Sequence, residues 1–162
     1  MYSKFIKPIL YVLFLIIVQF TLVPLISIEG VVPNLPIIAV IYYTLLYGQL
    51  YGTYFGFFSG LIFDIASGGL LGAAMFTFTI SAFLSGYFCN ENKIEQNTST
   101  FMFSLIVFIV SIINCFIYSA ISTKVQAIGF LFLFLYTGLL PGIYTLIFSF
   151  AVPLIKPKGN LL

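Results

Sequence analysis

The chain has 162 residues, of which 62% are hydrophobic and 6% are charged, and its formal net charge is +2. A soluble domain carries about 25% charged residues, so this chain lacks the polar surface that a water-soluble fold needs. Its basic residues are all lysines and form no run, which excludes electrostatic binding of nucleic acid. The composition predicts an all-α integral membrane protein: a single transmembrane domain over residues 1–162, with about six helices in contact with the lipid bilayer.

The first predicted helix covers residues 8–28. Lys4 and Lys7 precede it, and the apolar stretch Ile9–Ile28 is 20 residues long. The apolar core of a secretory signal peptide is shorter and is followed by a small-residue cleavage site. We therefore interpret this segment as an uncleaved membrane helix.

The second and third predicted helices cover residues 34–48 and 52–66. No charged residue lies between Glu29 and Asp64, a run of 34 residues. As one helix this run would be about 51 Å long, too long for a single crossing of a ~30 Å hydrocarbon core. We predict a turn at 47–52, where glycine, glutamine and tyrosine gather. Both helices are short for a full crossing, and a re-entrant hairpin shielded by protein is an open alternative.

Three further helices are predicted, at residues 70–89, 101–122 and 129–152. A polar loop at 90–100 separates the first two of these helices, and a short turn around Lys124 separates the last two. The last helix contains Gly138 and Pro141-Gly142, so we expect a kink there.

The lysines predict the orientation in the membrane. With six crossings, both termini lie on the same side. Five of the six lysines fall on that side and Lys124 alone falls on the other; the five are Lys4, Lys7, Lys93, Lys156 and Lys158. Because lysine and arginine are enriched in cytoplasmic segments, both termini are predicted to be cytoplasmic.

Glycines at intervals of four are the strongest local pattern, and Gly52, Gly56, Gly60 and Asp64 should form a ridge on one face of a helix. Small residues at this spacing let a second helix approach closely. We favour packing of the ridge within one subunit. Contact with another subunit, including a second copy in a homodimer, stays open.

Asp64 is the only charged residue predicted inside a membrane segment. Such residues are usually paired or functional, because a charge in the bilayer is costly. Asp64 precedes a predicted turn formed by Ser67, Gly68, Gly69 and Gly72. Its carboxylate could cap the next helix by accepting backbone N–H bonds, or it could contact a ligand or partner. A proton pathway is less favoured, since no histidine, arginine or second acid accompanies it.

Enzymatic chemistry has little support. The chain contains no histidine, which excludes Ser-His-Asp and Cys-His arrangements. The acidic residues are scattered, and Cys89 and Cys115 match no metal or redox spacing. The glycine-rich segment 67–72 is not followed by the Lys-Ser/Thr of a phosphate loop. We predict no catalytic residue, metal site or cofactor, and expect Gln19 and Asn114 to bond between helices as structural ties.

The segment 33–87 resembles the MreD family of bacterial rod shape-determining proteins. The family opens its second helix with Pro-Asp-Leu, which reads Pro33-Asn34-Leu35 here. A glycine-spaced helix that ends in Gly-x-x-x-Asp matches residues 56–64, and the Ser-Gly turn with a following Leu-Gly matches residues 67–72. Gly86-Tyr87, at the end of the fourth helix, also fits the family pattern.

This resemblance implies a non-enzymatic scaffold of the cell-elongation machinery in the bacterial inner membrane. MreD-like proteins bind MreC, a single-span protein, and through it join the MreB filament and the peptidoglycan synthases. The implied fold is similar to the six-helix substrate-binding subunits of energy-coupling-factor vitamin transporters. We hypothesise that the ridge and Asp64 support the contact with the MreC helix. Two departures, Asn34 in place of the acid and a turn at 48–50 without arginine, argue against charge-based contacts there.

Two rival functions are compatible with a small membrane bundle. A substrate-binding subunit of a vitamin transporter should carry Ala-x-x-x-Ala on its first helix, yet residues 9–28 contain no alanine and no glycine. Its pocket should also contain several convergent polar groups, of which the outer half of this sequence offers few. A small intramembrane enzyme would have to use Ser122 and Lys124 for catalysis. A serine two residues from a lysine is a common sequence pattern and does not by itself indicate an active site.

Overall fold

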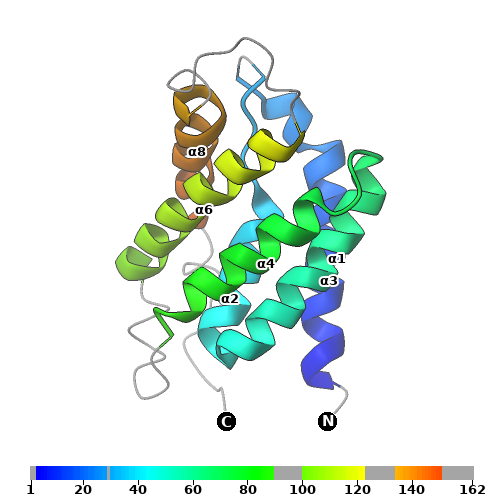
Figure 1. The fold of residues 1–162 in the computed structure, drawn as a ribbon, viewed down its shortest axis with the longest axis vertical. Coiled ribbons are helices and arrows are strands. Elements are labelled where there is room, and N and C mark those ends of the chain that lie inside the picture. Colours follow the sequence, from blue (N-terminus) through cyan, green and yellow to red (C-terminus); the bar gives the residue numbers. More distant parts are fainter. Residues whose placement is uncertain (1–2, 29, 90–99, 123–133, 151–162) are drawn as a thin grey trace.

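The structure is a computed structural model, and it describes residues 3–28, 30–89, 100–122 and 134–150. These residues form six α-helices, one 3-10 helix and one π-helix, and contain no strand, which confirms the all-helical prediction. Successive α-helices run alternately up and down the bundle in Figure 1. The start of α1, the turn between α2 and α3, and the end of α4 all lie toward its lower end.

The elements, in chain order, are α1 (Ser3–Thr21), η1 (Val23–Ile26), α2 (Leu35–Tyr47), α3 (Gln49–Ser67), α4 (Ala73–Gly86), α6 (Thr100–Ser122), the π-helix η3 (Phe134–Leu139) and α8 (Leu140–Ser149). The polar loop at 90–99 and the turn around Lys124 lie outside the described residues.

The first helix is shorter than the predicted 8–28, because α1 ends at Thr21. Pro24 follows one turn later, and a proline has no N–H to continue the α-helical hydrogen bonds. The chain instead forms the 3-10 helix η1 and then a tight reversal in which Ile28 and Val31 exchange backbone hydrogen bonds.

The turn between α2 and α3 consists of Gly48 alone rather than the predicted segment 47–52. Its φ of +94° lies in the region that glycine adopts at no steric cost. Its N–H bonds to the carbonyl of Thr44 at 2.9 Å, and its carbonyl accepts from Gly52 at 3.0 Å. One residue therefore ends one helix and begins the next, so α3 starts at Gln49 rather than at residue 52.

The fourth and last helices also differ from their predicted ranges. α4 begins at Ala73 rather than 70, because Gly72 has a φ of +101° and stands outside the helix. It ends at Gly86, three residues before the predicted end. In the last helix, residues 129–133 lie outside the described part, and the irregularity expected near Pro141 takes the form of the π-helix η3.

The helix α2 forms the centre of the core. Its residues 36–41 are all buried, and Ile37, Val40 and Ile41 have no exposed surface. A helix that is apolar on every side packs in the interior of a bundle. Side chains from α1, α4 and α6 surround it, among them Val12, Phe78 and Val107.

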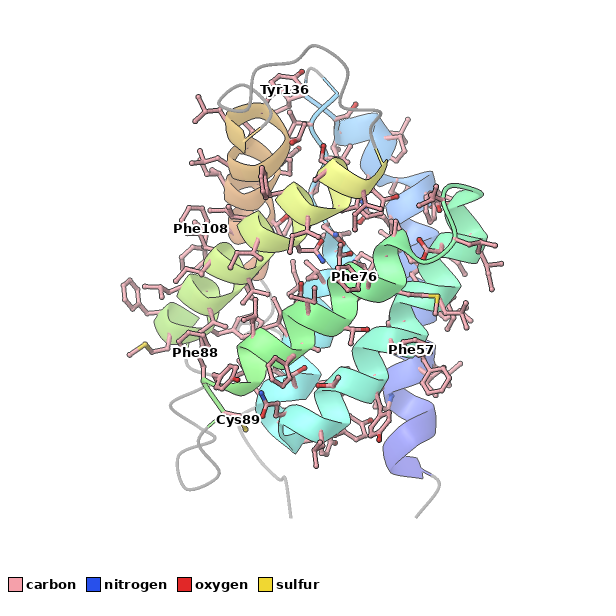
Figure 2. All side chains as sticks on the ribbon, in the orientation of Figure 1. Phe57, Phe76, Phe88, Cys89, Phe108 and Tyr136 are labelled. Atoms are coloured by element: carbon pink, nitrogen blue, oxygen red, sulfur yellow. The ribbon has the colours of Figure 1, made fainter. Side chains whose placement is uncertain are left out.

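Within the described helices, only the Phe101–Ile121 part of α6 is long and apolar enough by itself to span a membrane. Shorter apolar helical segments are Pro8–Thr21, Leu35–Tyr47, Ala73–Gly86 and Leu135–Ser149. Large apolar side chains cover the outside of the bundle, and Figure 2 shows Phe57 and Phe108 projecting from opposite flanks. An apolar exterior of this kind suits a lipid environment rather than water.

Candidate functional site: the α3–α4 ridge and two capped helix starts

The glycine ridge of α3 faces other helices of the same chain. A Cβ built on Gly60 would lie 2.5 Å from the carbonyl oxygen of Ala74, and one built on Gly56 would lie 2.7 Å from that of Phe78. A Cβ on Gly52 would overlap the side chain of Thr44 in α2. Such distances leave no room for any side chain, so glycine is what lets the α3 backbone approach its neighbours.

The facing side of α4 is complementary to this ridge. It presents Ala74 and Ala82, both without exposed surface, around the buried ring of Phe78. At the far end of the contact, a Cβ on Gly86 would meet Gln49, whose Nε2 donates to the carbonyl of Phe83 at 3.0 Å. As a result, α3 and α4 make the most extensive contact between any two described helices.

Asp64 closes the other end of this helix pair. Its side chain is 1% exposed and accepts three backbone N–H bonds from the start of α4. Oδ2 accepts from Gly72 at 2.8 Å and from Met75 at 3.1 Å, and Oδ1 accepts from Ala74 at 3.0 Å. The carboxylate thus satisfies amides that a helix start leaves without partners, at the end where the helix dipole favours negative charge.

The turn between Asp64 and α4 is built from small residues. The Ser67 hydroxyl donates to the Asp64 carbonyl at 3.0 Å and accepts from the Gly69 N–H at 3.3 Å. Gly68 and Gly72 have φ values of +62° and +101°, which side-chain-bearing residues rarely adopt. This geometry returns the chain so that α4 begins directly against the carboxylate.

A second buried side chain satisfies the start of α2. Gln19 of α1 is 8% exposed, and its Oε1 accepts from the Leu35 N–H at 2.9 Å. Its Nε2 donates to the carbonyl of Pro33 at 2.8 Å. Pro36 has no N–H, and the Ile37 N–H bonds to the Asn34 side chain at 3.4 Å. Each of the first three positions of α2 is therefore accounted for without water.

Asn34 connects this helix start to three more helices. Its backbone N–H donates to Thr145 Oγ1 of α8 at 3.0 Å, and its Nδ2 donates to Asn114 Oδ1 of α6 at 3.4 Å. Asn114 in turn donates to the Ser81 hydroxyl of α4 at 3.1 Å. We call Gln19, Asn34, Asn114, Ser81 and Thr145 the polar hub, since they tie four other helices, α1, α4, α6 and α8, to the start of α2.

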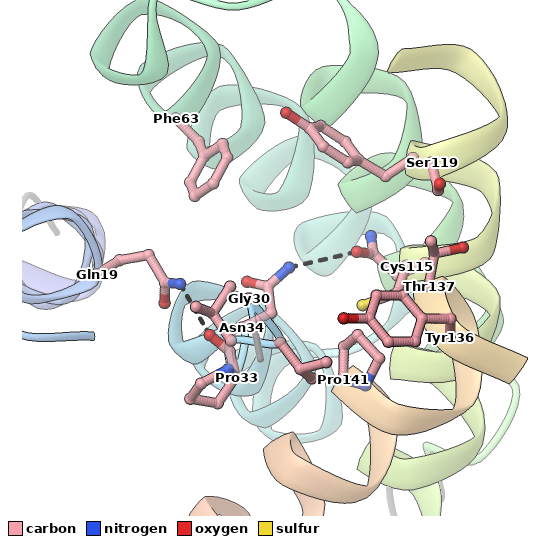
Figure 3. Close-up of a pocket in the computed structure, with 14 residues that line it drawn as sticks. Gln19, Gly30, Pro33, Asn34, Phe63, Cys115, Ser119, Tyr136, Thr137 and Pro141 are labelled. Atoms are coloured by element: carbon pink, nitrogen blue, oxygen red, sulfur yellow. Dashed lines mark hydrogen bonds between the residues drawn. The ribbon is translucent and has the colours of Figure 1, made fainter. Parts of the chain in front are cut away.

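A cavity of about 300 Å³ opens beside the polar hub (Figure 3). Gln19, Asn34 and Asn114 lie on its wall, together with Phe63 of α3, Tyr118 of α6 and Tyr136 of the π-helix. Cys115 also lines it, whereas Cys89 lies at the opposite end of the molecule, where its thiol contacts the Leu45 carbonyl. No group of three metal-ligating side chains occurs in the described part of the chain.

The sequence predicted some residues of this arrangement and not others. It singled out the ridge, Asp64 and the turn residues, and the structure brings all of them together at the α3–α4 contact. It treated Gln19 and Asn114 as ties between helices, which their bonds confirm. The same expectation covered several serines and threonines within the helices, but it did not single out Ser81 and Thr145, for which the only signal was a polar side chain in an apolar helix.

We predict that Gly60→Ala lowers the stability of the bundle by about 1–3 kcal/mol, because the new Cβ would collide with the α4 backbone. Thermal unfolding of the purified protein in detergent measures the effect. The matched control is Gly69→Ala, whose Cβ would meet only Ser67 Oγ at 3.4 Å and should change stability by about 0.5 kcal/mol or less. Equal unfolding temperatures for the two variants would contradict the close helix contact.

Asp64→Ala should cost about 3 kcal/mol or more, because it leaves three buried N–H groups without an acceptor. Asp64→Asn should cost less, since its amide keeps one acceptor oxygen. The same unfolding assay compares both variants with Ser67→Ala, which removes the two turn bonds of a half-buried hydroxyl and should cost about 1 kcal/mol. The capping role fails if Asp64→Ala is no less stable than Ser67→Ala.

Gln19→Leu should destabilise the bundle by about 1–3 kcal/mol, because the Leu35 N–H and the Pro33 carbonyl both lose their partner. Thr21→Val is the control in the same helix, since the Thr21 hydroxyl is exposed and bonds only the Ile17 carbonyl. That change should stay within about 0.5 kcal/mol. A Gln19→Leu protein as stable as the control would show that the polar hub contributes little.

Comparison with known proteins yields one match. The sequence model of a family described as rod shape-determining protein MreD matches residues 2–155. No curated protein and no solved structure matches the chain. MreD is a membrane protein family with a role in rod shape determination, and the match covers nearly the whole sequence. The chain therefore belongs to the MreD family of rod shape-determining proteins.

Proposed function

We propose that this chain is a non-enzymatic membrane scaffold that binds MreC and thereby helps to couple MreB to peptidoglycan synthesis. The observation that carries the proposal is family membership over residues 2–155. The absence of histidine from the whole sequence supports a structural rather than a catalytic role.

The α3–α4 pair supports this role because it is built as a rigid unit. Its glycine ridge faces inward, so any support that the ridge gives to MreC is indirect. By fixing α3 against α4, the ridge fixes their outer faces, where Phe57, Phe58, Phe76 and Phe83 are exposed. A partner helix that packs on such a face finds a surface already in its bound shape, which lowers the entropic cost of association.

The proposed topology is multi-pass with both termini cytoplasmic. The six α-helices in the described part of the chain alternate in direction, so their ends lie on alternating sides of the bundle. Lys4 and Lys7 lie at the start of α1, Lys93 lies between α4 and α6, and two further lysines follow α8. Lys124 alone lies between α6 and the last helix. Under the positive-inside rule, this asymmetry supports chain ends in the cytoplasm of the bacterial cell.

Affinity purification tests the proposal. We predict that the tagged chain, extracted from its native membrane in mild detergent, retains MreC, as detected by mass spectrometry. A Gly56→Leu, Gly60→Leu double variant that still inserts should retain at least about tenfold less MreC, because α3 and α4 can no longer approach. Gly69→Leu, in the adjacent turn, serves as the control.

Normal MreC recovery with the double variant would contradict a role for the α3–α4 pair. Loss of MreC from the wild-type sample would contradict the scaffold itself. If the wild-type chain instead retains paired ATPase subunits and a transporter membrane subunit, the vitamin-transporter alternative is favoured.

A further inference from the structure

The cavity beside the polar hub is built to donate hydrogen bonds. A primary carboxamide has two N–H donors. Within the described part of the chain, Gln19, Asn34 and Asn114 each use Nε2 or Nδ2 for one bond. Each side chain therefore has a second N–H that these bonds do not use, and all three side chains line the cavity. The start of α2 lies there as well, and a helix start carries partial positive charge.

None of the described residues that line the cavity is charged. An ionic ligand would have to leave water for a site with no counter-charge, which is unfavourable. Most of the wall is apolar, and Figure 3 shows Phe63 and Tyr136 facing the same space from opposite helices. Aromatic walls with a few convergent polar groups are typical of small-molecule sites, and about 300 Å³ lies at the lower end of their size range.

The backbone around the cavity is also irregular. Tyr136 and Thr137 belong to the π-helix η3, and Pro33 and Asn34 belong to the extended segment before α2. π-helical turns occur frequently at functional sites. In a membrane protein, non-helical backbone persists where it is buried in protein or lines a cavity.

We propose that this cavity binds an uncharged, ring-sized group whose hydroxyl or carbonyl oxygens accept hydrogen bonds from Asn34, Asn114 and Gln19. The group has two sources with the same chemistry: a free small molecule, or the headgroup of a neutral membrane lipid. Phe63 of α3 lines the cavity, but the three proposed donors lie outside the α3–α4 pair, and binding to the cavity does not require MreC, so the proposal is independent of the scaffold role proposed above.

The test is thermal unfolding of the full-length protein in a zwitterionic detergent that contains no sugar. The free probes are methyl β-D-glucopyranoside and benzamide, each paired with a charged counterpart, glucuronate and benzoate. The lipid-borne probe is monoglucosyl diacylglycerol, paired with diacylglycerol. At least one neutral ring should raise the unfolding temperature by several degrees, increasing with concentration, while its counterpart does not. A free probe that works indicates a soluble ligand, and an effect confined to the glucolipid indicates a lipid headgroup.

Two variants keep the test specific. Val31→Phe fills the cavity from its wall and should abolish the shift, whereas Ile28→Phe, exposed in the same reversal and off the wall, should preserve it. Asn34→Asp retains a helix cap but loses both N–H donors, and should weaken binding about tenfold. The proposal is overturned if no neutral probe stabilises the protein, if a charged counterpart stabilises it equally, or if Val31→Phe responds like the wild type.

Discussion

The backbone N–H groups at the starts of α2 and α4 impose the constraint on which the rest of the bundle depends. These helices have 13 and 14 residues, about 20 Å each, and are too short to cross a ~30 Å apolar core. Their first turns therefore begin within the bundle, away from bulk water, and need acceptors from the protein itself. In each case a buried side chain of an earlier helix does so, Gln19 of α1 for α2 and Asp64 of α3 for α4, and the N-cap residue Asn34 adds a bond at the start of α2. The same bonds join α1 to α2 and α3 to α4.

Close packing between helices then holds the two joined pairs, α1 with α2 and α3 with α4, together in one bundle. The glycines of α3 allow its backbone to touch that of α4. This close approach adds dispersion contacts between the two helices that larger residues would prevent. In α8, Gly142 plays a similar part against Ile112 of α6. The polar hub adds bonds between α1, α2, α4, α6 and α8 at a single point. A body tied together in this way keeps its outer faces fixed, which is what a scaffold for a partner helix requires.

Much of this arrangement could be predicted from the sequence, because local patterns encode it. Low charge indicated the membrane class, and the spacing of the glycines and Asp64 indicated a packing face that ends at a cap. The side of α4 that packs on this face also has a local pattern, since four of its residues repeat at the same interval of four: Ala74, Phe78, Ala82 and Gly86. The end of α1 was misplaced because the prediction ran the helix through Pro24. The polar hub was not predictable, since Asn34 and Thr145 are 111 residues apart and no spacing reveals their contact.

Amide hydrogen exchange in lipid nanodiscs measures the central constraint most directly. If buried side chains cap the short helices, the amides of Leu35, Ile37 and residues 72–75 should exchange as slowly as those in the middle of α2 and α4. The turn residues Gly68 and Gly69, which are exposed, should exchange orders of magnitude faster. Exchange at the two helix starts as rapid as in that turn would contradict the capped, water-free arrangement.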